Sequence, residues 1–146
     1  MKFLLDTNAV SEIIRSSPDP DFMAWLESAE ELDRDLDDAL HVSVLTIGEL
    51  RRGVLKLSEG ARRDELSNFI GQTIAEYGPR ILPLGLPEID AWADLADRYR
   101  RTGVVVGFAD ELIAATAQVH DLTIVTRNTR HFEHSGCRIF SPWSRA

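Results

Sequence analysis

Apolar residues in this chain occur in two patterns: short continuous runs, and longer stretches in which they recur every three or four positions. Runs of this length, rich in Val, Ile and Leu, are typical of buried strands. They occupy residues 2–5, 41–46, 80–84, 122–126 and 138–140. Between them, the three- and four-residue spacing predicts amphipathic helices. These cover residues 9–15, about 20–29, 47–58, 61–77, 87–102 and 108–120, with a short helical turn at Phe132.

The alternation of strands and helices predicts the fold class. Strands separated by long helical stretches pair in parallel, because only a crossover helix returns the chain to the same edge of a sheet. We therefore expect a three-layer α/β/α sandwich with a central, mainly parallel sheet, formed by one domain over residues 1–146. Local signals support the element bounds: Thr7 and Asn8 are helix-capping types, Pro87 opens a helix, and Gly103 ends it.

One segment does not fit either apolar pattern. Residues 30–38 contain six acids and one arginine. Burying so many charges would carry a large desolvation cost, which predicts an exposed, solvated loop. A calcium loop is the less favoured interpretation, because the segment lacks the glycine and the spaced ligands of such a site.

Composition indicates the cellular compartment of the protein. No apolar run approaches the roughly 20 residues of a membrane-spanning helix, and Asp6 interrupts the N-terminal run before it reaches the length of a secretory signal. Cys137 is the only cysteine, so no intrachain disulfide is possible. These features predict a cytoplasmic protein without a membrane partner.

The net charge of −8 bears on possible ligands. Nucleic-acid affinity normally depends on many Lys and Arg contacts to phosphate, so binding of a polyanion here would need a local source of positive charge. Divalent cations bound by clustered acids, or the surface of a partner protein, would supply that positive charge.

Polar side chains follow several of the predicted strands. Asp6 comes directly after the first, Glu49 lies just beyond the second, and Asn128 follows the strand at 122–126, while Asp110 lies in the first turn of a helix. Each has a simple structural alternative, as a helix cap or a turn residue. Together they fit one crevice at the carboxyl ends of parallel strands, where ligands of such folds bind.

Three carboxylates in one crevice would repel each other unless a cation lay between them. All-oxygen ligands favour Mg²⁺ or Mn²⁺ over zinc. Such a site activates water and stabilises charge on a phosphate, which favours phosphodiester hydrolysis. His131 and His134 are interpreted as a solvated pair rather than as ligands. Trp25, Trp92 and Trp143 are interpreted as packing residues rather than as platforms for bases.

Five segments, in order along essentially the whole chain, resemble the PIN-domain toxins of the VapC and FitB kind. They are Leu4–Asn8, Ser43–Leu50, Ala109–Ala117, Val125–Asn128 and the closing Ser141–Trp143. The resemblance implies a Mg²⁺- or Mn²⁺-dependent endoribonuclease that attacks transfer or ribosomal RNA. It also implies the toxin of a type II toxin–antitoxin pair, which a small antitoxin inhibits, and a homodimer.

The resemblance assigns roles to individual residues. Asp6, Glu49 and Asp110 match the metal-binding acids, and with Asn128 they form the expected catalytic set. Asn128 departs from the family pattern, because it stands where the fourth acid is expected. Asn8 matches a polar residue beside the first acid, and it is expected to hold a ligand or water in place as a substrate-binding residue.

Three neighbouring residues are candidates for supporting roles. Glu111 is expected to face outward, because adjacent helix positions point about 100° apart. Arg127 and Arg130 are candidates for contact with RNA phosphates, or alternatively for ion pairs with local acids.

Two other functions compete with this one. An aspartyl-phosphate enzyme or receiver also places an Asp after the first strand, but it needs a second Asp in place of Asn8, or a lysine at a strand end. Lys2 and Lys56 are the only lysines. A catalytically weakened module that binds RNA or an antitoxin is the other alternative, and Asn128 is its main support.

Overall fold

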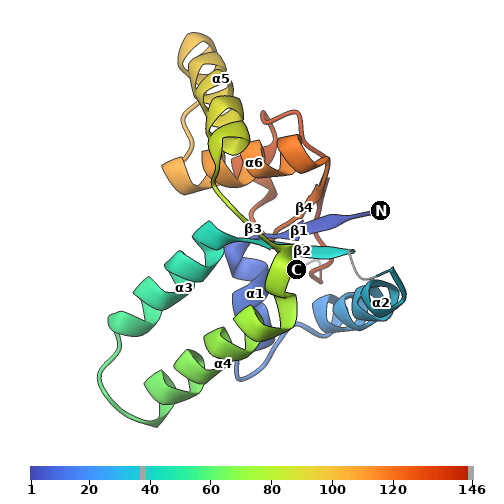
Figure 1. Cartoon of the computed structure of the whole chain (residues 1–146), viewed down its shortest axis with the longest axis vertical. Coiled ribbons are helices and arrows are strands. Elements are labelled where there is room, and N and C mark those ends of the chain that lie inside the picture. The colour runs from blue at the N-terminus through green and yellow to red at the C-terminus, as the bar shows by residue number, and fades with distance from the viewer. Residues whose placement is uncertain (37–38, 145–146) are drawn as a thin grey trace.

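The computed structural model describes residues 1–36 and 39–144. Its five strands form one sheet in the order β3-β2-β1-β4-β5, and all neighbouring strands are parallel (Figure 1). The strands are β1 (Phe3–Leu5), β2 (Leu40–Ser43), β3 (Ile81–Leu82), β4 (Thr123–Val125) and β5 (Ile139–Phe140). The predicted parallel sheet is therefore confirmed.

Helices cover both faces of this sheet (Figure 1). They are α1 (Thr7–Ile13), α2 (Pro20–Leu36), α3 (Val44–Leu55), α4 (Ala61–Tyr77), α5 (Leu86–Thr102) and α6 (Phe108–His120), with short 3₁₀ turns η1 (Gly78–Arg80) and η2 (Thr129–Phe132). One core lies between the sheet and α1 to α4, and the other between the sheet and α5 and α6. The three-layer sandwich is confirmed.

Alternation along β1 and β4 explains the two cores. Phe3, Leu5 and Val125 belong to the core with α1 to α4, whereas Leu4 and Ile124 belong to the core with α5 and α6. Successive side chains of a strand point to opposite faces, so a strand covered on both sides must be apolar throughout. This is why the strand segments appear as continuous apolar runs.

Several predicted bounds are confirmed. Helix α4 spans residues 61–77 as expected. Helix α5 has Pro87 in its first turn and ends at Gly103, whose φ of 75° places it in the left-handed region that glycine adopts without strain. Strand β3 is an edge strand, which explains why Pro83 is tolerated directly after it.

The loop prediction for the acidic segment was wrong over residues 30–36, which belong to α2. Asp33 is buried, accepts hydrogen bonds from the backbone N–H groups of Ala39 and Leu40, and lies 2.6 Å from Arg80 of η1. These partners offset the desolvation cost on which the loop prediction relied. Asp37 and Asp38 lie outside the described residues.

Two helix starts also differ from the prediction. Asp6, rather than Thr7 or Asn8, caps α1, because its side chain accepts from the Thr7 N–H. Helix α3 begins at Val44, three residues before the expected start, where the Ser43 side chain accepts from the Leu45 N–H. A cap formed by the last residue of a strand shortens the strand and starts the helix early.

Within the described part of the chain, no helix is both long enough and apolar enough to span a membrane.

Candidate active site

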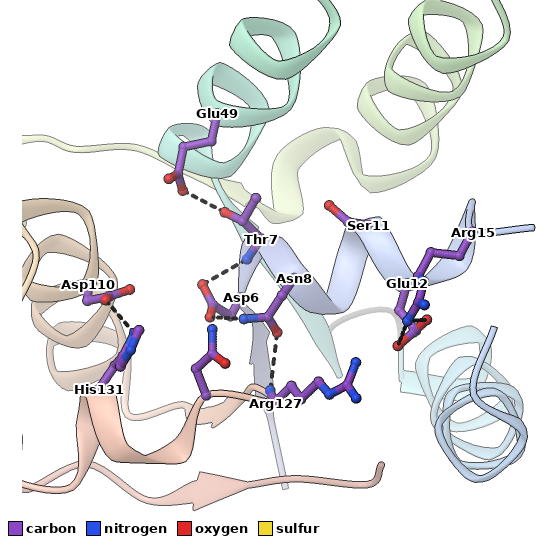
Figure 2. A pocket seen from close by; sticks show the side chains of 11 residues that line it. Asp6, Thr7, Asn8, Ser11, Glu12, Arg15, Glu49, Asp110, Arg127 and His131 are labelled. Carbon is purple, nitrogen blue, oxygen red and sulfur yellow. Dashed lines mark hydrogen bonds and ion pairs between the residues drawn. The ribbon is translucent and has the colours of Figure 1, made fainter. Parts of the chain in front are cut away.

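A groove of about 440 Å³ opens at the carboxyl ends of β1, β2 and β4. It is lined by residues from α1, α3, α6 and the segment that follows β4 (Figure 2). The lining residues are Asp6, Thr7, Asn8, Ser11, Glu12, Arg15, Glu49, Asp110, Arg127, Asn128 and His131. The four residues expected to form the catalytic set therefore share one groove.

Asp6 lies at the centre of the groove, directly after β1. Its side chain is buried and accepts hydrogen bonds from the Thr7 N–H at 2.8 Å, the Asn8 amide at 2.9 Å and the Thr126 hydroxyl at 2.9 Å. Burial raises the pKa of this carboxyl, and the charges of Asp110 and Glu49 raise it further, while the hydrogen bonds from Thr126 and Thr7 oppose the increase. The hydrogen bonds thus hold the ionised form in place against burial and the neighbouring charges.

Glu49 reaches the same groove from the second turn of α3. The Thr7 hydroxyl donates to its Oε1 at 2.6 Å, and the Thr7 and Thr46 hydroxyls lie 3.0 Å apart. Thr7 thus connects two acids, because its backbone N–H bonds to Asp6 while its hydroxyl bonds to Glu49. Figure 2 shows Glu49 and Asp6 on either side of Thr7.

Asp110 enters from the first turn of α6 and contacts His131 of η2. The His131 Nδ1 lies 2.9 Å from Asp110 Oδ2, and the imidazole is about half exposed, at 53%. His131 is exposed, as expected for a solvated residue, but it also contacts an acid of the groove, whereas His134 is exposed outside the groove. The position of His131, three residues after Asn128 beyond a strand end, was the available signal.

Asn8 and Thr126 organise the floor of the groove. The Asn8 amide nitrogen donates to Asp6, and its Oδ1 accepts from the Arg127 backbone N–H at 3.2 Å. The Thr126 hydroxyl accepts from the Asn128 backbone N–H at 3.0 Å while it donates to Asp6. Asn8 therefore positions Asp6 and the segment after β4.

The basic candidates separate in space. Arg127 lines the groove, whereas Arg130 is exposed and is not among the lining residues. Glu111 is not among them either, as expected for an outward-facing position. The sequence did not single out Glu12, near the end of α1, or Arg15, just beyond it, and both line the groove at its other end.

The donor set suits a hard divalent cation, although the carboxylates are not drawn into a tight cluster. Among the described residues, no three His, Cys, Asp or Glu side chains are close enough together to hold one metal ion in this arrangement. A hydrogen bond from Thr7 holds Glu49, and a contact with His131 holds Asp110, beside Asp6. The carboxylate oxygens of Asp6 and its two acidic neighbours are the ligands that Mg²⁺ and Mn²⁺ prefer.

A family model with the description PIN domain matches residues 3–136. The chain belongs to the PIN-domain family. Among its relatives, a VapC ribonuclease of Sinorhizobium fredii is 35% identical over 144 residues, which cover 98% of this chain and 99% of that protein. Toxin FitB of Neisseria gonorrhoeae is 36% identical over 141 residues, which cover 96% of this PIN-domain protein and 97% of the relative.

Solved structures agree with the family assignment. The crystal structure of FitAcB from Neisseria gonorrhoeae superposes with a TM-score of 0.86 at 34% identity, covering 98% of this chain and 99% of that one. VapBC2 from Rickettsia felis, solved with a DNA fragment, gives a TM-score of 0.80 at 20% identity, covering 99% of this chain and 100% of that one. At the lower identity the likeness concerns the PIN fold alone.

Proposed function

We propose that this PIN-domain protein is a Mg²⁺- or Mn²⁺-dependent endoribonuclease and the toxin of a toxin–antitoxin pair. The observation that carries the proposal is the groove at the ends of parallel strands that Asp6, Glu49 and Asp110 line together, with Asp6 buried and its pKa raised further by the other two. A cation in the groove would offset the burial and the repulsion that raise the pKa of Asp6. The names of the relatives, VapC ribonuclease and toxin FitB, support the substrate class and the toxin role.

In this proposal the three carboxylates would hold the cation, which would lower the pKa of a water molecule and offset charge on the phosphate. Thr7, Asn8 and Thr126 keep Asp6 and Glu49 in place through the hydrogen bonds described above. His131 fixes the Asp110 carboxylate at one side of the groove. Asn128 lines the groove and offers an amide oxygen to a water molecule.

Arg127 is proposed as a contact to RNA phosphate, because it is the expected basic candidate that lines the groove. Arg130 stays a weaker candidate, since an RNA strand must extend beyond the groove to reach it. The RNA class expected from the family resemblance is transfer or ribosomal RNA.

A cognate antitoxin is proposed as the protein partner. This rests on FitB, which is named a toxin, and on the solved structure of FitAB bound to a DNA fragment, whose fold matches at 33% identity and a TM-score of 0.85. A homodimer is also proposed, and light scattering of the purified protein tests it. A mass equal to one chain of 16.4 kDa at all concentrations would exclude it.

A weakened module that binds without cutting is the second candidate. It is supported by Asn128, which contributes no negative charge to the groove, and by the absence of a tight metal-ligand cluster among the described residues. The aspartyl-phosphate alternative has no such support, because the chain belongs to the PIN-domain family.

Cleavage of labelled RNA with Mn²⁺, Mg²⁺ or EDTA separates the two candidates. Asp110→Asn is the most informative variant, because Asp110 contacts His131 but does not cap a helix as Asp6 does. Asp94→Asn, at an exposed site on α5, removes the same charge outside the groove and serves as the control. We expect metal-dependent cleavage by the wild type and the control, and none by Asp110→Asn. RNA binding without cleavage by the wild type would favour the module.

A further inference from the structure

A second set of charged residues lies in the groove beside the carboxylates. Glu12 and Arg15 line the same groove as Asp6, at the end farther from Asp110 (Figure 2). Arg15 Nη1 lies 3.0 Å and 3.3 Å from the two carboxylate oxygens of Glu12. The two residues form an ion pair one helical turn apart.

The two partners differ sharply in exposure, and this difference indicates a role. The Glu12 side chain is only 2% exposed, whereas the Arg15 side chain is 54% exposed. The Trp143 indole N–H donates to Glu12 across 131 residues of sequence, and the Trp143 ring stacks on Phe22 at a centroid distance of 4.5 Å. The buried Glu12 carboxylate is therefore held by the packed Trp143 and in turn orients the more exposed Arg15 guanidinium.

The Arg15 guanidinium keeps donors available to a ligand. Both contacts to Glu12 use Nη1, and no described residue hydrogen-bonds to Nε or Nη2. A planar guanidinium held on one side presents its remaining N–H groups in a fixed fork, which matches the oxygens of a phosphate. Because it is already oriented, it loses little conformational entropy when it binds.

We propose that Arg15 binds a phosphate of the RNA strand next to the one held at the carboxylates, and that Glu12 and Trp143 are positioning residues for it. This proposal rests on the ribonuclease function proposed above. The groove then has two zones for a polyanion: carboxylates that need a cation, and a cationic end that binds phosphate directly. In Figure 2 the Arg127 side chain also extends toward Glu12 and away from Asp110, which adds a second cation to that end.

A protein ligand is the competing occupant. Arg15 also borders an apolar groove between α1, α3 and α4, lined by Leu50, Val54 and Phe69 among others. A partner bound in that apolar groove would come close to Arg15. RNA is favoured because the Arg15 guanidinium shares the polar groove with the metal-binding carboxylates.

The test compares two pairs of neutral replacements. Glu12→Gln/Arg15→Gln removes the ion pair without leaving a buried carboxylate unpaired, and the amide oxygen introduced by Glu12→Gln can still accept from Trp143. Asp97→Asn/Arg100→Gln is the matched control, since Arg100 and Asp97 form an ion pair of the same spacing on α5, outside the groove. Neither double variant changes the net charge.

Binding of a short, mixed-sequence single-stranded RNA is measured by fluorescence anisotropy over a range of salt, with Asp110→Asn added to every variant to prevent cleavage. For Glu12→Gln/Arg15→Gln we expect binding about tenfold weaker at low salt, as for the loss of one charge-assisted contact. The slope of log affinity against log salt should fall by about 0.7, the value for one phosphate of a single strand. The control pair should change neither quantity.

Single variants separate phosphate binding from positioning. Arg15→Lys keeps the charge, so the salt slope should be retained while the affinity falls. Glu12→Gln leaves Arg15 charged but no longer held, and it should raise KM for cleavage with little change in kcat. A merely structural role would lower the melting temperature without this split between KM and kcat.

Two results would overturn the proposal: an unchanged salt slope and KM in Glu12→Gln/Arg15→Gln, or weaker binding of a copurified protein partner with RNA binding intact. Failure of the ribonuclease function is a different result, namely no cleavage by the wild type with Mn²⁺. The binding measurement still tests Arg15 in that case, because it does not depend on cleavage.

Discussion

The buried Asp6 carboxylate opposes the stability of the fold. Its side chain is buried, and the nearby charges of Asp110 and Glu49 help raise its pKa above the ordinary value of 3.8. A raised carboxyl pKa means that the folded state binds more protons than the unfolded state just above pH 3.8. The contribution of Asp6 to the stability of the metal-free protein therefore falls as the pH rises through that range, and the ionised Asp6 is destabilising at neutral pH.

Replacing Glu49 with Gln should relieve part of this cost. Gln keeps an acceptor for the Thr7 hydroxyl but removes one of the charges that raise the pKa of Asp6. We expect the free energy of unfolding in EDTA at neutral pH to increase, on the order of 1 kcal/mol for one partly screened repulsion. Metal-dependent cleavage should be lost at the same time. Urea denaturation with and without EDTA measures the effect, and a less stable metal-free variant would contradict it.

An ion pair between a helix and a 3₁₀ turn explains why part of the acidic segment is buried rather than exposed. Asp33 of α2 is buried against Arg80 of η1, with only 11% and 14% of their side chains exposed. Asp33 also accepts from backbone N–H groups at the start of β2, and Arg80 donates to the Leu40 carbonyl at 3.0 Å. A charge in an acidic stretch thus joins a helix, a 3₁₀ turn and a strand.

Arg80→Met should therefore destabilise the fold. It leaves the Asp33 carboxylate buried without its cation, a change that costs about 3 kcal/mol in comparable cases. Asp33→Asn/Arg80→Met removes both charges and should recover part of that loss. Thermal or chemical denaturation of the wild type, the single and the double variant measures the difference. Equal stability of the single variant and the wild type would contradict a buried ion pair.

A second connection joins α5 to α6. Glu88 lies in the first turn of α5, its side chain is 4% exposed, and its Oε1 is 3.0 Å from the His120 Nε2 near the end of α6. The hydrogen bond from His120 lowers the pKa of Glu88 below its ordinary value of 4.5. A lowered carboxyl pKa contributes stability that is complete above pH 4.5 and is lost as the pH falls through the folded-state pKa.

Comparison of the wild type with Glu88→Gln across acid pH tests this contribution. The wild type should be the more stable protein at pH 6, and the difference should shrink as the pH falls below the ordinary pKa of Glu88. Chemical denaturation at a series of pH values provides the measurement. A stability difference that grows toward acid pH would show that the sign is wrong.

At the scale of the whole molecule, the sheet order brings remote segments to one place. Strand β1 lies between β2 and β4, so residues just beyond these three strands share one edge of the sheet. Asp6 follows β1, Glu49 lies in α3 just after β2, and Asn128 follows β4. Asp110 lies near them because α6, which directly precedes β4 in the chain, packs on one face of the sheet. The groove is thus a consequence of the parallel topology.

Metal binding should stabilise the whole fold. A ligand that binds only the folded state at about 100 times its dissociation constant adds about 2.7 kcal/mol. The melting temperature should therefore rise by several degrees with saturating Mn²⁺ and return with excess EDTA. Asp110→Asn should lose most of the increase, whereas Asp94→Asn should keep it. An equal rise in both variants would place the ion outside the groove.

The sequence by itself determined the features that depend on neighbours along the chain. Apolar runs, helical spacing, Pro87 and Gly103 predicted the layers and most helix bounds, because backbone geometry acts over a few residues. Asp6, Glu49 and Asn128 could be proposed together, since a parallel sheet gathers at one edge the residues just beyond the carboxyl ends of its strands, and Asp110 was added from the first turn of a nearby helix.

Only the tertiary structure decided the contacts between distant residues. These contacts are the buried ion pair of Asp33 with Arg80 and the contact of His131 with Asp110. A third is the hydrogen bond from Trp143 to Glu12. No local pattern predicts these pairs, because the cost of burying a charge depends on whether a partner arrives from elsewhere in the chain. The same reason explains why Arg15 could not be recognised in the sequence: its orientation depends on Glu12, which is fixed by a tryptophan near the opposite end of the polypeptide.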